Sequence, residues 1–216
     1  MDFAAFLRSA TVISGTELCP EVRLHQAEDL TELWRAQESW LGRTGLPPPF
    51  WGVAWPGGQG LARYTLDNPD LFRDRSVLDL GSGSGLCAIA AAKAGAGGVA
   101  GADIDPFSLE AIAANAELNE VRVGTIQGDV IGSQPRWDVI LAGDLWYERF
   151  LADRVTDWLT RMALEGTMVL FGDSDRAFFP RGSMEEIERY AIKAPESIDR
   201  DGIGLTKVWR VRPVRL

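Results

Sequence analysis

The chain has few of the residues on which metal, redox and secreted proteins depend. Its 216 residues include two cysteines, Cys19 and Cys87, and a single histidine, His25. Two cysteines do not make a disulfide framework, and one histidine without a cysteine cluster argues against a zinc site, a haem site or a Ser-His-Asp triad. We therefore expect no metal and a reducing, cytoplasmic location, with Cys87 as a small buried residue.

Basic charge and long apolar runs are also lacking. Lys and Arg number 22 against 31 Asp and Glu, which gives a net charge of −9. A nucleic-acid-binding protein normally has a basic face, so we expect no nucleic-acid partner, whereas a basic protein or a small molecule is compatible. No apolar run approaches the roughly 20 residues that span a bilayer. The first nine residues resemble neither a secretory signal nor a transit peptide, so no membrane association is predicted.

Apolar segments alternate with helical patterns from residue 76 onward, which predicts a parallel α/β sheet with helices on both faces. The strands are expected at 77–80, 98–102, 121–127, 137–142 and 167–171. Helices are expected at 86–94, 106–119 and 149–162. Two final strands, at 190–194 and 205–212, are predicted around a polar turn at 199–204.

The first 70 residues have a different texture. Short β-like pieces at 11–13 and 22–24 precede a helix at 29–40, a proline-rich stretch at 45–58 and a helix at 59–66. We interpret residues 1–70 as an extension that packs on a core of residues 71–216 and forms a lid over substrate and cofactor, within one compact domain.

A glycine-rich turn follows the first strand of the core, in the run Val77-Leu-Asp-Leu-Gly-Ser-Gly-Ser-Gly-Leu86. Such a turn brings backbone N–H groups and a helix N-terminus to a nucleotide-like ligand, although many such loops only make turns. The spacing is not the G-x-G-x-x-G of dinucleotide sites. It resembles motif I of the class I S-adenosylmethionine (SAM) methyltransferases. The resemblance implies that SAM is the cofactor and that this motif binds it through Asp79, Gly81, Ser82, Gly83 and Gly85.

Acidic residues follow the next two strands, where α/β folds bind their ligands. Asp103 lies about 20 residues after the glycine turn, which suits a carboxylate that accepts hydrogen bonds from the ribose hydroxyls, with Ile104 beside it. Asp105 fits a cap for the helix that begins at Pro106; the alternative is that both aspartates only cap this helix. Asp129 either accepts the adenine amino group or belongs to a simple Gly-Asp turn.

The fourth strand ends in Gly143-Asp-Leu-Trp-Tyr147, which resembles the D/E-x-x-Y/F signature of seven-strand protein lysine methyltransferases. A carboxylate at Asp144 would orient the lysine ammonium, and an aromatic wall at Tyr147 would hold its aliphatic stem. The alternative is that Asp144 caps the following helix and that Trp146 and Tyr147 belong to the core. Gly143 would lie against the cofactor.

Two tryptophans stand among the prolines of residues 45–58. A Trp-Pro pair just before the sheet also occurs in that group of methyltransferases, where the tryptophan lies beside the cofactor. The resemblance therefore assigns Trp55 to the cofactor, whereas an anchoring role in the core is the alternative and suits Trp51 better.

Taken together, the chain resembles the lysine methyltransferases that act on the β subunit of electron transfer flavoprotein, in their bacterial form. The matching segments are Leu46-Pro-Pro-Pro-Phe-Trp51 with Trp55 and Gly57-Gly58, Val77–Leu86, Ala102–Phe107 with Asn115, Ala142–Glu148, and Thr206-Lys-Val-Trp-Arg210. The resemblance implies a Rossmann-like sheet of seven strands with an antiparallel C-terminal strand. It also implies SAM-dependent methylation of lysine on a protein, most simply that β subunit, by a monomer.

Two other functions are compatible with the residues alone. A small-molecule N-methyltransferase shares the glycine turn and the ribose aspartate but needs a closed pocket. A non-catalytic SAM-binding domain shares the same fold.

Overall fold

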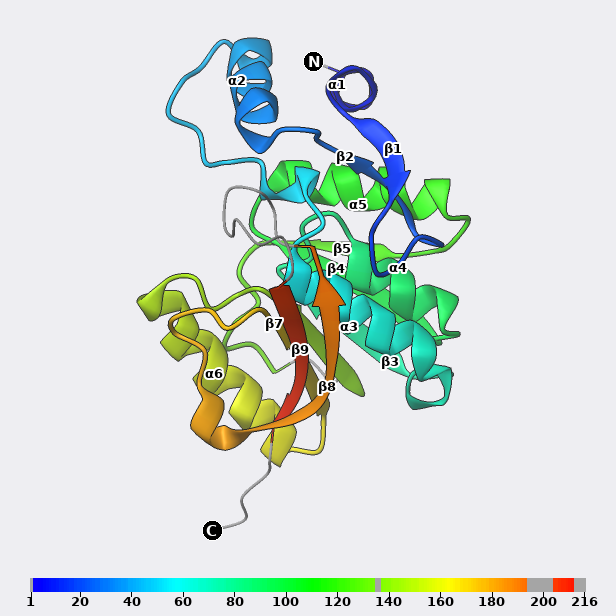
Figure 1. Ribbon diagram of the computed structural model, residues 1–216, viewed down its shortest axis with the longest axis vertical. Helices are drawn as coiled ribbons and strands as arrows, with labels where there is room; N and C mark the ends of the chain where they lie inside the picture. The colour runs from blue at the N-terminus through cyan, green and yellow to red at the C-terminus, as the bar shows by residue number, and fades with distance from the viewer. Residues whose placement is uncertain (1, 135–136, 194–203, 212–216) are drawn as a thin grey trace.

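A computed structural model describes residues 2–134, 137–193 and 204–211. Its centre is one seven-stranded sheet, in which the first five strands across are parallel and the last two run antiparallel to their neighbours (Figure 1). The order across the sheet is β5 (Gly124–Gln127), β4 (Gly98–Asp103), β3 (Ser76–Leu80), β6 (Val139–Gly143), β7 (Met168–Asp173), β9 (Gly204–Val211), β8 (Met184–Ile192). The predicted fold, including the antiparallel C-terminal strand, is confirmed.

Helices cover both faces of the sheet, also as predicted. One face carries α3 (Pro56–Asp67), α4 (Leu86–Lys93) and α5 (Pro106–Leu118), and the other carries α6 (Arg149–Leu164). The alternation of side chains along β3 shows why, because Val77 packs in the cluster that contains Ile89 of α4. Leu78 and Leu80 point the other way and pack with Trp158 of α6. In Figure 1, α6 lies on one side of β7 and β9, and α3 lies on the other.

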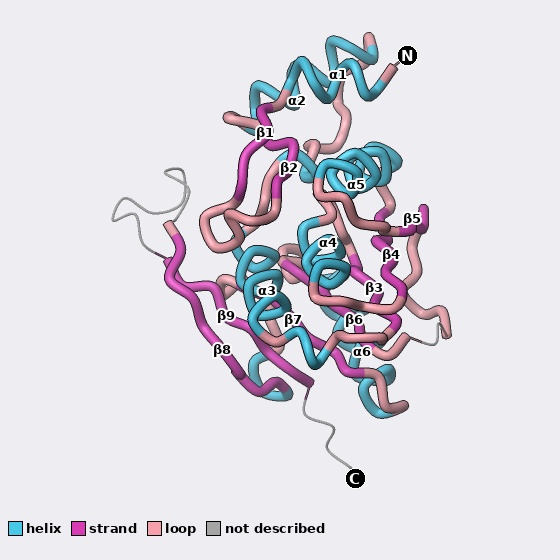
Figure 2. Tube along the Cα trace, turned by 90° about the vertical axis from the view of Figure 1, so that its right-hand side faces the viewer, coloured by secondary structure: helices cyan, strands magenta, loops and turns pink. Residues whose placement is uncertain are grey.

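The N-terminal segment lies against α5, one of the helices that cover the central sheet (Figures 1 and 2). It consists of α1 (Phe3–Ala10), the antiparallel pair β1 (Val12–Gly15) and β2 (Arg23–Gln26), and α2 (Leu30–Leu41). An aromatic cluster joins these elements to the core, since the ring of Phe3 lies 5.4 Å from the rings of both Trp51 and Phe107.

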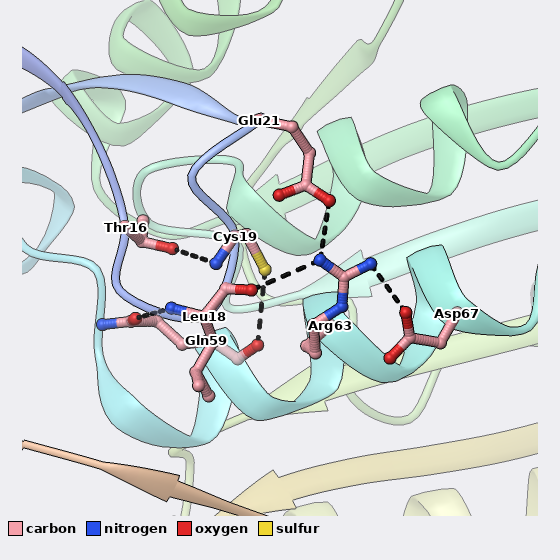
Figure 3. A network of polar contacts seen from close by, with 7 residues as sticks. All are labelled: Thr16, Leu18, Cys19, Glu21, Gln59, Arg63 and Asp67. Atoms are coloured by element: carbon pink, nitrogen blue, oxygen red, sulfur yellow. Dashed lines mark hydrogen bonds and ion pairs between the residues drawn. The ribbon is translucent and has the colours of Figure 1, made fainter.

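A polar network fixes the loop between β1 and β2 onto α3 (Figure 3). The guanidinium of Arg63 on α3 contacts Glu21 at 2.6 Å and Asp67 at 2.7 Å. It also donates to the Leu18 carbonyl at 3.4 Å, while the Gln59 side chain accepts from the backbone N–H of Leu18 at 3.3 Å. The pKa of Arg63 is raised because its hydrogen bonds to the two carboxylates outweigh burial, which alone would lower it.

Some boundaries differ from those expected, and α1 was not predicted. The strand expected at 190–194 is β8, which already begins at Met184; its acidic residues are accommodated because β8 is an edge strand. Helix α3 begins at Pro56 instead of residue 59, with Gly57 and Gly58 in its first turn. Residues 194, 199–203 and 212 of the predicted tail lie outside the described residues. None of the described helices is long and apolar enough to cross a membrane.

Candidate active site

The glycine turn after β3 needs glycine at its three predicted positions. Gly81, Gly83 and Gly85 have φ angles of +63°, +52° and +83°, a region that other residues rarely adopt. A Cβ on Gly81 would also come within 2.5 Å of Leu145 Cδ2. From the other side, the buried amide of Asn115 donates to the Ser84 carbonyl at 2.8 Å and thereby fixes the turn to α5.

The side chain of Asp79, in the strand β3 that precedes the turn, stabilises the turn through hydrogen bonds. Its Oδ2 accepts from Ser82 Oγ at 2.6 Å and from the backbone N–H of Ala88, in the first turn of α4, at 3.0 Å. Burial raises the pKa of Asp79 to about 7, against the opposing effect of these hydrogen bonds. Asp79 and Ser82 thus have partners within the protein, and both line the cavity described below.

Asp103 ends β4 directly opposite the turn. Its Oδ2 accepts from the N–H of Gly83 at 2.9 Å and its Oδ1 from the N–H of Asp105 at 2.9 Å. A carboxylate offers about four acceptor positions, so about two remain for further donors. Asp105 caps α5 through the N–H of Phe107 at 2.9 Å, as predicted, and Ile104 between them is exposed.

Asp129 follows β5, the next strand across. It forms an ion pair with Arg154 of α6 at 2.7 Å and accepts from the N–H of Ile131 at 2.9 Å. These hydrogen bonds hold the pKa of Asp129 below its usual value, against a raising effect of burial. The carboxylate therefore has a partner from α6 that the sequence did not indicate.

A cavity of about 740 Å³ opens where these strand ends meet, within the usual range of about 300–1,000 Å³ for small-ligand sites. Every predicted site residue except Gly85 lines it. The core contributes Asp79, Gly81, Ser82, Gly83, Asp103, Ile104, Asp129, Gly143, Asp144 and Tyr147. Residues 1–70 contribute Gln37, Leu46, Pro47, Pro48, Phe50, Val53, Trp55 and Gly58. The glycine turn, the helix N-terminus behind it and the free acceptor positions of Asp103 fit a ligand with a carboxylate and a ribose.

Asp144 lies at the end of β6 in a left-handed conformation, with φ +56°. Its Oδ2 accepts from the N–H of Gly58 at 2.9 Å, and the N–H of Gly57 also faces the carboxylate. Its Oδ1 accepts from Arg176 Nε at 3.2 Å and Nη2 at 3.0 Å. Burial raises the pKa of Asp144, and Arg176 and the two N–H groups oppose that rise.

The structure bears on the alternative interpretation of the segment after β6, in which Asp144 caps a helix and Trp146 and Tyr147 belong to the core. Asp144 does not cap the following helix, because α6 begins after Glu148; it meets the N-terminus of α3 instead. Trp146 is fully buried and belongs to the core, as the alternative held. Tyr147 is half exposed and lines the cavity, so it is no core residue.

Three aromatic rings stand together at the cavity. The ring of Phe50 lies 5.7 Å from that of Trp55 and 6.3 Å from that of Tyr147. The indole N–H of Trp55 donates to the Phe50 carbonyl at 3.1 Å, and the Arg176 guanidinium lies 5.7 Å from the Trp55 ring centre. Sequence reasoning did not single out Phe50 or Arg176; the Pro-Pro-Pro-Phe-Trp run held a signal for Phe50, but nothing local marks Arg176.

The fold and the cavity define a class I SAM-dependent methyltransferase. The family model of ribosomal protein L11 methyltransferase (PrmA) matches residues 63–170. The fold is similar to that of a crystal structure of Thermoplasma acidophilum 1320, with 22% identity, TM-score 0.56, 73% of this chain and 91% of that one. Magnesium protoporphyrin IX methyltransferase from Synechocystis with bound SAM is also similar, with 12% identity, TM-score 0.52, 72% of this chain and 78% of that one.

Curated relatives define the family. The electron transfer flavoprotein beta subunit lysine methyltransferase of Danio rerio is 39% identical over 92% of this chain and 79% of its own length. The human protein of the same name is 37% identical over 98% of this chain and 83% of its own length. The chain belongs to this family of lysine methyltransferases, and SAM is its cofactor.

Proposed function

We propose that this enzyme methylates lysine side chains on the β subunit of electron transfer flavoprotein. The observation that carries the proposal is similarity at 37–39% identity over more than nine-tenths of the chain to two proteins named for that activity. The site is compatible with it, because a carboxylate and three aromatic rings line one cavity, in which a lysine side chain has both a charge partner and an apolar wall.

The proposed division of labour places the cofactor on the turn after β3. Gly81, Gly83 and Gly85 let the backbone approach it, and Asp79 and Ser82 hold the turn in shape. Asp103 accepts from the ribose hydroxyls through its remaining acceptor positions, beside Ile104. Gly143 and Trp55 line the cofactor, and Asp129 meets the adenine end while it stays paired with Arg154.

The proposed catalytic residues are Asp144 and Tyr147. When bound, SAM supplies a methyl group on a sulfonium, which the lysine nitrogen takes as the carbon–sulfur bond breaks. The free lysine pKa of about 10.4 means that the amine must first lose a proton, which passes to water. Asp144 orients the nitrogen, Tyr147 holds the stem, and most of the rate comes from this positioning at about 3 Å.

The N-terminal residues 1–70 complete the proposed site as a lid on the core of residues 71–216. Support comes from the run 46–55, which contributes Leu46, Phe50 and Trp55 to the lining of the cavity. We further propose that the enzyme acts as a monomer in the cytoplasm; its two cysteines are free and buried, which suits a reducing compartment.

The test of the substrate is incubation of the enzyme with tritiated SAM and purified candidate proteins. The electron transfer flavoprotein β subunit should be labelled, and mass spectrometry of its peptides should place the methyl groups on lysine. Ribosomal protein L11 is the matched comparison, since the family model that covers half of the chain carries its name. Label in L11 alone, or only in small molecules of a cell extract, would overturn the proposed substrate.

A further inference from the structure

Arg176 holds the acceptor positions of Asp144 that a substrate lysine needs. A carboxylate offers about four acceptor positions. At Asp144 the N–H of Gly58 takes one on Oδ2, at 2.9 Å, and the N–H of Gly57 also faces the group. Arg176 takes both positions of Oδ1 through Nε and Nη2, at 3.2 and 3.0 Å. A lysine that binds Asp144 must therefore displace one of these donors.

Of these donors only Arg176 is free to leave. Gly57 and Gly58 are fixed in the first turn of α3, where a Cβ on Gly57 would come within 2.4 Å of the Gly172 carbonyl. Arg176 belongs to the segment that follows β7, between Asp175 and Ala177, which are both exposed. Its backbone N–H donates to Asp173 Oδ1 at 2.8 Å, so the backbone stays anchored when the long side chain swings out.

The surroundings of the guanidinium match those proposed for the lysine ammonium. One side faces the Asp144 carboxylate, and the face of Trp55 lies 5.7 Å away. Because Asp144 is only 7% exposed, removal of the cation beside its charged form is strongly unfavourable. Exchange of one cation for another keeps that balance, whereas departure of Arg176 without a replacement would leave a buried charge alone.

We infer that Arg176 stands in for the substrate lysine in the free enzyme, occupying its ammonium position until the substrate displaces it. This inference rests on the proposed role of Asp144 as the lysine-binding carboxylate. It makes Arg176 a residue that competes with the substrate, so that substrate binding is a cation exchange at Asp144.

The test uses n-butylammonium chloride, which carries the lysine side chain without a protein. The backbone N–H of Gly58, which donates to Asp144, reports binding in an NMR titration of the intact protein. Arg176→Ala should bind n-butylammonium at least fivefold more tightly than wild type, because no competing cation remains. Arg176→Lys, which keeps a cation, should bind as weakly as wild type. The double variant Asp144→Asn, Arg176→Ala should lose the gain.

Equal or weaker binding by Arg176→Ala than by wild type would overturn the inference, since a purely structural Arg176 predicts that Asp144 becomes disordered without it. If Arg176→Ala does not fold, Arg176→Gln takes its place with the same expected direction, because it removes the charge but keeps a donor. Failure of this inference about Arg176 can be distinguished from failure of the proposed function. Tighter binding without methylation of the flavoprotein subunit overturns only the substrate; methylation without tighter binding overturns only the stand-in.

Discussion

At the scale of residues, two aspartates at the ends of β4 and β6, the strands on either side of β3, differ in how many of their acceptor positions the protein itself uses. Asp103 spends about half of its acceptor positions on the backbone of the glycine turn and of Asp105, which leaves the rest for a ligand. The acceptor positions of Asp144 are occupied by the backbone N–H at the start of α3 and by the guanidinium of Arg176. Asp103 therefore suits a partner that adds hydrogen bonds, and Asp144 suits a partner that replaces one.

Removal of the Asp103 carboxylate should weaken cofactor binding. We expect Asp103→Ala to cost about 1.5–3 kcal/mol of SAM binding, the usual range for a hydrogen bond to a charged group, or roughly 10- to 100-fold in Kd. Isothermal titration calorimetry measures this directly. Glu110→Ala, an exposed acidic residue on α5, is the matched control and should leave the Kd unchanged. An unaltered Kd in Asp103→Ala would refute the ribose assignment.

The raised pKa of Asp79 should make stability depend on pH. The folded protein holds this proton up to about pH 7, whereas the unfolded chain releases it near pH 3.8. Lowering the pH from 8 to 5 should therefore stabilise the wild type relative to Asp79→Asn, by roughly 2–3 kcal/mol. Urea unfolding of both proteins at the two pH values checks this. A constant difference between them would show that Asp79 titrates normally.

Strand ends in a parallel sheet meet at one edge, and this rule together with the family resemblance predicted most of the cavity. The glycine turn, Asp103, Asp144, Tyr147 and Trp55 all lie there. Arg176 escaped prediction because its role depends on a contact across 32 positions in the chain, made by a long side chain from a loop. The partner of Asp129 on α6 escaped for the same reason.

At the scale of elements, the position of Asp144 depends on how closely α3 approaches β7. A Cβ on Gly57 would come within 2.4 Å of the Gly172 carbonyl and 2.6 Å of Asp144 Oδ2. Because Gly57 and Gly172 have no side chains, the N-terminus of α3 can lie on the backbone of β7. The N–H groups of this helix end then reach the Asp144 carboxylate. This contact was not predictable from the sequence, because paired glycines lower helix propensity and α3 was therefore expected to begin at residue 59.

Substitution of the two adjacent glycines should separate close packing from helix propensity. Gly57→Ala should destabilise the protein by about 1–3 kcal/mol, as overpacking does. Gly58→Ala is the matched control: its Cβ would meet nothing nearer than Cys87 Sγ at 4.0 Å. It should be neutral or stabilise by about 0.5–1 kcal/mol. Chemical denaturation of both variants gives the comparison, and equal effects would contradict the packing account.

The Arg63 network should contribute measurably to the attachment of the N-terminal segment. Arg63→Ala removes the links to Glu21, Asp67 and the Leu18 carbonyl, and we expect a loss of about 1–2 kcal/mol, reduced from a fully buried pair because the group is partly solvated. The exposed pair Arg73–Asp70 provides the control. Arg73→Ala should cost less than about 0.5 kcal/mol in the same urea titration. Similar losses of unfolding free energy in both variants would mean that the Arg63 network stabilises the protein no more than an exposed ion pair does.

Element prediction failed where tertiary context overrides local pattern. Helix α1 carries an Asp2 cap and Phe3, Phe6 and Leu7 on one face, yet it is short and lies at the chain start. Strand β8 pairs along its whole length with β9, although four of its nine residues are charged. Edge strands tolerate such charges. In a sequence pattern, however, the same charges argue against a strand.

At the scale of the whole molecule, the cavity belongs to two parts of the chain. The sheet supplies the glycine turn and the aspartates, and residues 46–55 supply prolines, Phe50 and Trp55. The mostly parallel sheet with an antiparallel C-terminal strand was predictable from the β-α alternation together with the family resemblance. The aromatic contacts that join the N-terminal segment to the core were not predictable, because they have no periodic signature.

The most direct test of the account compares wild type with Asp144→Asn, which keeps the shape of the side chain but removes its charge. Both are incubated with SAM and the electron transfer flavoprotein β subunit, and lysine methylation is followed by mass spectrometry while the Kd for SAM is measured on the same samples. We predict that Asp144→Asn loses methyl transfer by at least about 100-fold, the loss that a misplacement of about 1 Å can cause, and binds SAM within a few-fold of wild type. Methylation at the wild-type rate, or an equal loss of SAM binding, would contradict the assignment of Asp144 to the substrate lysine.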